Sequence, residues 1–124
     1  MEQIKVTVDW CGKNYASYIN DPRICGVVLS TAKTFEKLQQ ETERSLNFHL
    51  EGCIADGDPI AEFIRNGAYE LVYEKRVSAI LHEAQQFTTL AAISRVTGIR
   101  QAQLSHYINA VDNCHFSHAI SLLN

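Results

Sequence analysis

The chain has 124 residues, of which 46% are hydrophobic and 20% are charged, and its formal charge is −3. This length fits one ordinary domain or two very small ones, and the composition excludes a disordered chain. The opening MEQIKVTVDW has no basic segment followed by an apolar stretch, and the longest aliphatic run, at positions 90–93, is far too short to cross a bilayer. We therefore expect a cytoplasmic protein with neither a secretory signal nor a membrane span.

The four cysteines, at positions 11, 25, 53 and 114, are scattered and include no C-x-x-C pair. In a reducing compartment, cysteines arranged in this way are expected to be free thiols that behave as small hydrophobic residues.

The charges are divided unevenly. Residues 1–75 carry eight Lys or Arg and twelve Asp or Glu, whereas residues 76–124 carry three and two, together with four of the five histidines. This asymmetry favours an anionic partner for the second half, although on its own it is too weak to indicate nucleic-acid binding.

The first thirty residues predict three strands. Apolar and polar residues alternate over positions 4–10, which is the two-residue period of a sheet with one wet face. A hairpin turn over positions 11–14 leads into a second strand over 15–20, which a proline-containing turn ends. A third strand is expected over 24–29, with Gly26 as a candidate bulge.

The apolar period then changes to three and four residues between positions 35 and 53, which predicts a long helix. Thr34 or Thr31 suits its start and Gly52 suits its end. After a turn, the alternation over positions 68–74 predicts a fourth strand. The order β-β-β-α-β places three strands in a meander with one helix laid on a single face.

From position 76 onward the pattern is helical throughout. The apolar residues predict helices around 77–84, from 90 to the break at Gly98, around 104–108, and around 116–123. Almost no linker separates them from the last strand. The expected fold class is therefore α+β, with an α/β domain over residues 1–75 and an all-α domain over residues 76–124.

The segment over positions 89–109 has the pattern of a helix-turn-helix. This motif needs a small residue where two helices cross, a turn residue tolerant of positive φ, an apolar residue after the turn, and an apolar anchor in the second helix. These roles fall, in order, to Ser94, Gly98, Ile99 and Leu104. The pattern resembles DNA-binding domains of the lambda-repressor and Cro type, in which alanine is commoner than serine at the first of these positions. The alternative is a helical hairpin in an interaction domain.

If the second helix of the motif lies in a major groove, the residues opposite its apolar anchors face the DNA. These expected DNA-binding residues are Arg100, Gln101, Ala102, Ser105, His106 and Asn109, with Thr89 at the preceding helix start for a phosphate. Arg100 and Gln101 suit bidentate reading of guanine and adenine, each worth ~1–3 kcal/mol of discrimination. Because one copy would bind double-stranded operator DNA weakly, we expect a homodimer or a higher homo-oligomer.

Three short stretches of the first half carry a family resemblance: IKVTV at positions 4–8, YASY at 15–18, and above all HLEG at 49–52 followed by DGDPI at 56–60. Together they resemble HicB-like antitoxins, whose main helix ends in an H-L-E-G and G-x-x-I-P pattern. Two departures are that Ala61 replaces the usual proline and that Cys25-Gly26 stands where Pro-Gly-Cys-like turns are common.

The resemblance implies a partial RNase H-like fold for residues 1–74, with the helix-turn-helix appended. It also implies that the protein neutralises a small RNA-cleaving toxin of the HicA type through its first domain and represses its own operon through its second. An antitoxin of this kind is not an enzyme and needs no cofactor.

The sequence leaves three other interpretations open. A nuclease would need several carboxylates around a divalent metal, and although Asp9 is a candidate, acids such as Glu36 and Asp56 are expected on a wet helix face or in turns. A metal site over positions 114–118 lacks a second pair of ligands, and His49 is expected to be a partly buried helix residue rather than a ligand or base. The third is a stand-alone regulator whose first domain binds another protein or itself.

Overall fold

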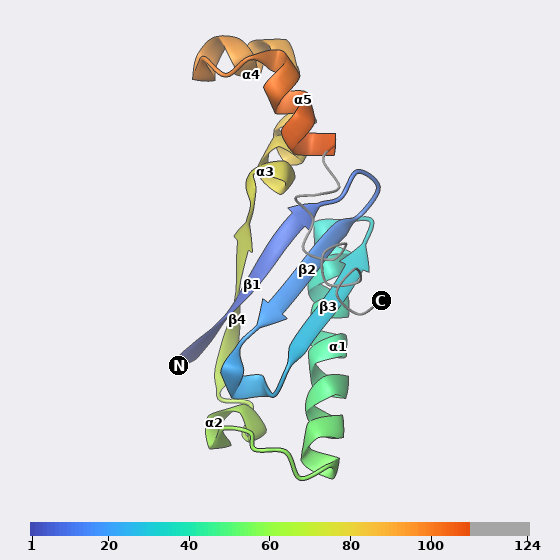
Figure 1. Cartoon of the computed structure of the whole chain (residues 1–124), viewed down its shortest axis with the longest axis vertical. Coiled ribbons are helices and arrows are strands. Elements are labelled where there is room, and N and C mark those ends of the chain that lie inside the picture. Colours follow the sequence, from blue (N-terminus) through green and yellow to red (C-terminus); the bar gives the residue numbers. More distant parts are fainter. Residues whose placement is uncertain (110–124) are drawn as a thin grey trace.

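The computed structural model describes residues 1–109, which form a mixed α+β structure. Strands β1 (Glu2–Trp10), β2 (Tyr15–Asn20) and β3 (Val27–Ala32) form an antiparallel meander, and β4 (Tyr69–Lys75) pairs in parallel with the free side of β1. The sheet order is therefore β3-β2-β1-β4. The long helix α1 (Phe35–Ala55) packs along one face of this sheet, and the short helix α2 (Glu62–Arg65) precedes β4 (Figure 1).

The core lies between α1 and the sheet, as the two apolar periods predict. Ile4, Val6 and Val8 alternate along β1 and are completely buried, while Leu38 and Leu46 face them from α1. Thr34 caps α1, because its side chain accepts a hydrogen bond of 3.2 Å from the backbone N–H of Lys37. One of the two predicted caps is therefore confirmed.

A buried polar pair ties α1 to the middle of the sheet. Thr42 donates a hydrogen bond of 2.6 Å to the carbonyl of Leu38, one turn earlier in α1. With its only hydroxyl proton used in this way, Thr42 accepts from Ser17 of β2 at 2.7 Å. Both hydroxyl groups are thus satisfied inside the core.

Two element boundaries differ from the prediction. The third strand begins at Val27 rather than at 24, because Asp21 accepts a hydrogen bond from the Arg23 N–H and starts a turn of 3-10 helix over Pro22–Ile24. Gly26 therefore precedes the strand and is not a bulge. Helix α1 also continues past Gly52, whose carbonyl accepts the Asp56 N–H at 3.0 Å, so Gly52 does not end it.

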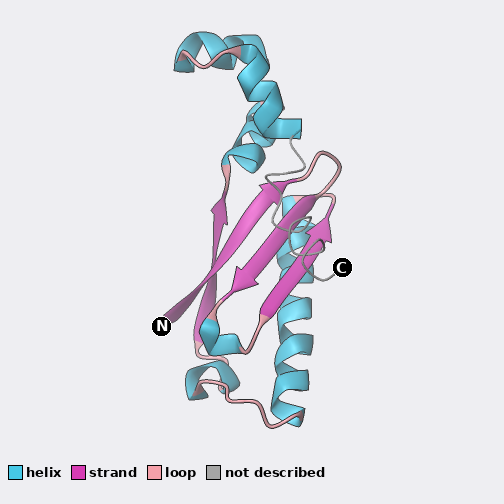
Figure 2. Cartoon of the chain, in the orientation of Figure 1, coloured by secondary structure: helices cyan, strands magenta, loops and turns pink. Residues whose placement is uncertain are grey.

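Three helices follow the sheet: α3 (Val77–Ala84), α4 (Leu90–Thr97) and α5 (Gln101–Asn109), grouped beyond one end of the strands (Figure 2). The predicted fourth helix and the 114–118 cluster lie outside the described residues. Leu81, Leu104 and Ile108 form the buried centre of a second, smaller core. Among residues 1–109, no helix has the length and apolar character needed to span a membrane.

Helix α3 belongs to both cores. Its Ala79 packs in the core of the sheet, while its Leu81 packs in the second core. Ser78 accepts a hydrogen bond of 3.0 Å from the backbone N–H of Trp10, at the end of β1. The ring of His82 stacks on the Trp10 indole with centroids 3.5 Å apart. The helical unit is therefore packed directly against the sheet.

Candidate nucleic-acid interface

The turn between α4 and α5 contains the predicted Gly98 and is held by hydrogen bonds from Ser94, Thr97 and the Gly98 backbone. Gly98 ends α4 with φ 75°, in the left-handed region, and its N–H donates to the carbonyl of Ser94 at 2.9 Å. Ser94 is more than a small residue, because its hydroxyl donates to the Ile99 carbonyl at 2.6 Å. Thr97 donates to the Ile93 carbonyl and accepts the Ile99 N–H. These bonds fix the direction in which the chain enters α5.

Helix α5 is anchored through one face. Leu104 and Ile108 are buried against Leu81 of α3, and Tyr107 is half-buried beside them. Leu104, the predicted apolar anchor of the second helix, is therefore the most buried residue of the second core, and the opposite face of α5 is left toward solvent.

The predicted contact residues are distributed along that outer face. Arg100 stands at the start of α5, since its carbonyl accepts the N–H groups of Gln103 and Leu104. The exposed members of the predicted set are Thr89, Arg100, Gln101, Ala102 and His106. Ser105 is half-buried, and Asn109 is the last residue of α5.

Thr89 caps α4, because its hydroxyl oxygen accepts the Ala92 N–H at 3.1 Å, which leaves its own proton available to a phosphate. Gln103 is an exposed residue that the predicted set omits. Its amide donates to the Tyr107 hydroxyl at 2.7 Å, one turn along the same helix. The sequence could have placed it, because position 103 is one turn before Tyr107 and so lies beside the apolar face rather than opposite it.

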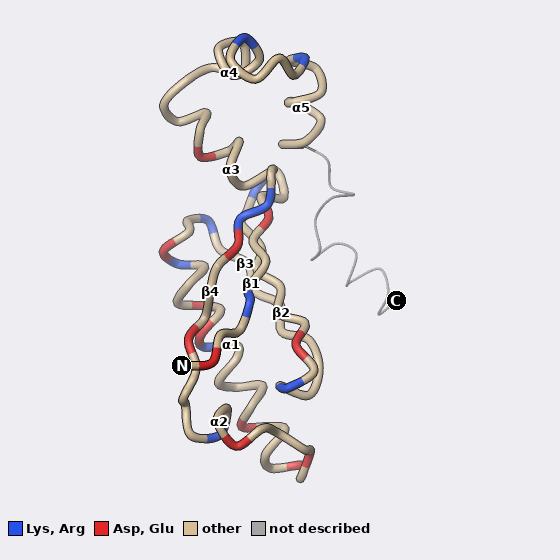
Figure 3. The backbone as a smooth tube through the Cα atoms, turned by 90° about the vertical axis from the view of Figure 1, so that its left-hand side faces the viewer, with Lys and Arg blue, Asp and Glu red and all other residues tan. Residues whose placement is uncertain are grey.

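The charge of this surface is entirely positive in the described residues. No Asp or Glu occurs between positions 84 and 109, so the tube over α4 and α5 carries blue segments and no red ones (Figure 3). Arg95 on α4 and Arg100 before α5 are both exposed. The nearest acid, Glu83, forms an ion pair of 2.9 Å with Lys75 and accepts a hydrogen bond from Tyr15. Burial, and then the charge of Glu83, raise the pKa of Tyr15 to about 12.

The carboxylates weighed for a nuclease do not come together. Asp9 is buried and lies 3.6 Å from the Arg76 guanidinium, which balances its charge. Among residues 1–109, the only cluster of three or more potential metal ligands is made of Cys25, His49 and Cys53.

This cysteine and histidine cluster corrects the expectation of free thiols. Cys25 and Cys53 form a disulfide between the β2–β3 connection and α1, and none of the cysteines in the described part is a free thiol. His49 is half-buried, as expected for a helix residue satisfied by its neighbours. The sequence carried one usable sign of the cluster: His49 and Cys53 are four residues apart on a confidently predicted helix, and so share a face.

No protein family model, curated protein or solved structure matches the chain.

Proposed function

We propose that this protein is a DNA-binding regulator that reads a double-stranded operator through α5. The observation that carries the proposal is the left-handed turn at Gly98, which joins two short helices whose outer surface bears arginines and no carboxylate. DNA presents a dense row of phosphates, so a surface of this charge is attracted to it. A helix fits the width of the major groove.

In this interpretation α5 lies in the major groove and α4 crosses the backbone. Arg100 and Gln101 are exposed at the start of α5, where a guanidinium or an amide reaches a base edge with two hydrogen bonds. Thr89, at the exposed start of α4, is placed to contact a phosphate. His106 lies one to two turns along α5 from this end and suits either a base edge or a phosphate.

Operator binding by this unit calls for two copies, because a single short recognition helix gives little affinity. Exposed apolar side chains on the helical unit support association: Phe87 is 89% exposed and Val96 is 88% exposed, and Val77 and Ile80 are also open to solvent. Exposed apolar side chains mark contact surfaces where they form a contiguous patch. We propose a homodimer or a higher homo-oligomer that acts in the cytoplasm.

We further propose that the sheet domain binds an RNA-cleaving toxin of the HicA type, which makes the protein an antitoxin that represses its own operon. The HLEG and DGDPI stretches support this role by their resemblance to HicB-like antitoxins. So does the sheet order β3-β2-β1-β4 with one covering helix, which agrees with a partial RNase H-like arrangement. The acid-rich composition of residues 1–75 suits a basic RNA-binding partner by charge complementarity.

The DNA-binding role is tested with the double variant Arg100→Ala/Gln101→Ala in gel shifts against the DNA upstream of its own gene. Two contacts of at least ~1 kcal/mol each predict a loss of affinity of ~30-fold or more. The matched control is Arg44→Ala/Gln40→Ala, which removes the same charge and amide from exposed positions of α1. Both variants should unfold at wild-type denaturant concentrations. Undiminished affinity in the α5 variant would mean that the recognition helix is misassigned.

The antitoxin role is tested separately by co-expression with a short basic protein encoded beside the gene. The α5 variant should still protect cells from that toxin, because its sheet domain is unchanged. If the wild-type protein binds the operator but gives no protection, the antitoxin role is wrong and a stand-alone regulator remains.

A further inference from the structure

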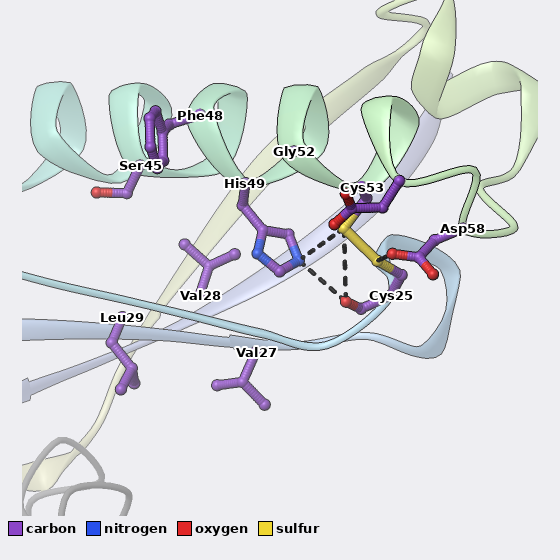
Figure 4. A pocket seen from close by; sticks show the side chains of 11 residues that line it. Cys25, Val27, Val28, Leu29, Ser45, Phe48, His49, Gly52, Cys53 and Asp58 are labelled. Atoms are coloured by element: carbon purple, nitrogen blue, oxygen red, sulfur yellow. Dashed lines mark hydrogen bonds between the residues drawn. A yellow bond between two sulfur atoms is a disulfide. The ribbon is translucent and has the colours of Figure 1, made fainter.

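The loop before β3 and the last turns of α1 bring two sulfur atoms and an imidazole together. His49 and Cys53 lie one turn apart on the face of α1 that looks toward Cys25 (Figure 4). Nε2 of His49 is 3.5 Å from Sγ of Cys53, and the ligand atoms of all three residues lie within 4.8 Å of one another. The 3.5 Å between Nε2 of His49 and Sγ of Cys53 is close to the separation of two ligand atoms on one tetrahedral zinc ion, because zinc bonds to nitrogen and sulfur are roughly 2.0–2.3 Å long.

The backbone at Cys25 is in a conformation that L residues rarely adopt. Its φ is 53°, and it is the only non-glycine residue with positive φ among residues 1–109. Gly26 follows with φ 122°, and a Cβ at this position would come within 3.3 Å of the His49 ring. The loop therefore turns the Cys25 sulfur toward α1 and leaves room for the imidazole. Conformations of this kind are unfavourable for L residues and cluster at functional sites.

A fourth ligand is at hand in the turn after α1. Oδ2 of Asp58, whose side chain is half-buried, lies 3.7 Å from Sγ of Cys25. The four residues line an open hollow of about 520 Å³ on the surface, which gives an ion a way in from solvent (Figure 4). The group of mutually close ligand atoms in the described residues comprises Cys25, His49 and Cys53 alone, so Asp58 would complete it by a side-chain movement. Asp56 lines the same hollow but is exposed, whereas Asp58 is half-buried and contacts Cys25.

We propose that this cluster is a zinc site when the Cys25–Cys53 disulfide is reduced, with His49 as the third ligand and Asp58 as the fourth. Thiolate and imidazole are ligands that Zn²⁺ favours, whereas Mg²⁺ and Ca²⁺ favour oxygen. The histidine and cysteine of α1 also have the i, i+4 spacing that zinc sites use on helices. The disulfide and the metal are thus alternative occupants of one place in the fold.

Exchange of the disulfide for the metal takes two steps. A dithiol reductant gives two electrons and two protons to the disulfide, which yields the two thiols and the oxidised dithiol. Zn²⁺ then displaces one proton from each thiol and binds the two thiolates. In the oxidised state Nε2 of His49 lies 3.0 Å from the Ile24 carbonyl oxygen and 3.1 Å from that of Cys25. A neutral imidazole that donates its Nε2–H to these carbonyl oxygens has no lone pair at Nε2. Its proton must therefore move to Nδ1 before Nε2 binds the metal.

The test uses the full chain with Cys11→Ser and Cys114→Ser, so that Cys25 and Cys53 are its only thiols. The protein is reduced with a phosphine, freed of metal, and titrated with Co²⁺, whose thiolate complexes absorb in the near ultraviolet; Zn²⁺ is then added in competition. We expect one Co²⁺ per chain, displacement by one Zn²⁺, and no thiolate band in the same protein left oxidised.

Matched variants separate ligands from neighbours. His49→Ala and Asp58→Asn should each weaken Zn²⁺ binding by about tenfold or more, whereas His106→Ala on α5 and Asp56→Asn in the same hollow should not. Circular dichroism of the reduced, metal-free proteins checks that each is folded. Because Asp58 lies outside α1, Asp58→Asn still tests the site if His49→Ala disturbs the helix. If no thiolate band forms, or if neither His49→Ala nor Asp58→Asn changes the affinity, the site does not exist.

Discussion

Replacing Gly98 by alanine isolates the conformational part of the turn between α4 and α5. The residue has φ 75° and ψ 4°, and an added Cβ would meet no atom within 4 Å. Steric overlap with the rest of the protein therefore contributes nothing, and only the left-handed backbone costs free energy. That cost is roughly 1–2 kcal/mol for an L residue. A stiffer unfolded chain returns ~0.4–1 kcal/mol, so Gly98→Ala should lower the free energy of unfolding by about 1 kcal/mol.

The same substitution at Gly52 supplies the control. Gly52 lies within α1, has no positive φ, and would likewise place its Cβ in open space. Alanine is better than glycine in a helix by ~0.5–1 kcal/mol, so Gly52→Ala should raise the free energy of unfolding. One chemical change at two glycines is thus expected to shift stability in opposite directions.

Urea titrations followed by circular dichroism measure both changes. A short series at position 98 sharpens the comparison: Gly98→Asn should cost less than alanine, because asparagine tolerates the left-handed region, and Gly98→Val should cost more. If Gly98→Ala is as stable as the wild type, or if asparagine and valine are equivalent, the turn does not require positive φ. The helix-turn-helix assignment would then lose its main support.

Two further predictions concern the core and the junction. Thr42→Val leaves the buried Ser17 hydroxyl without its acceptor and should lower the free energy of unfolding by ~1–3 kcal/mol. Ser17→Ala leaves Thr42 bonded to Leu38 and should lower it by less than ~1 kcal/mol. The double variant should lose less unfolding free energy than the sum of the two single variants. Burial lowers the pKa of the His82 ring, against an opposing effect of the Glu83 charge. The folded state therefore favours the neutral ring. This contribution to stability is complete above the pKa of ~6.5 that histidine has in the unfolded chain, and it is lost as the pH falls toward the lower pKa of the folded state. His82→Phe, which keeps a flat ring on Trp10, should therefore lose less unfolding free energy than the wild type between pH 7.5 and 5; equal losses in urea titrations would contradict this.

The elements themselves could be predicted because they depend on local periodicity. The alternation along β1 and the three- and four-residue period of α1 indicate which side chains face the core, and the structure confirms both elements. Boundaries set by a single side chain were harder. Ile24 looks like a strand residue, and only the capping of the Arg23 N–H by Asp21 turns the chain into a 3-10 helix before β3.

Contacts between distant parts of the chain could not be predicted from periodicity. Cys25 and Cys53 are 28 residues apart, and their meeting depends on where β3 begins and on which face of α1 turns inward. The misplaced start of β3 hid the loop that carries Cys25. In the helical unit, by contrast, the burial of Leu104 depends on a short motif with fixed spacing, so its role as an anchor could be predicted from the sequence. The hydrogen bond from Ser94 to the Ile99 carbonyl could not, because the motif requires only a small residue there.

Only Arg76 lies between β4 and α3, and its N–H is bonded to the Val8 carbonyl of the neighbouring strand. A repressor whose DNA-reading unit hangs on a flexible linker can adjust to operators with different gaps between their half-sites. In this protein no flexible linker joins the helical unit α3–α5 to the sheet. In a symmetric dimer the distance between the two copies of α5 would therefore be fixed by the contact between the protomers. Under the proposed function, base substitutions between the two half-sites of the operator would weaken binding less than the insertion of a few base pairs. An insertion would rotate one half-site around the DNA axis and away from the α5 helix that binds it.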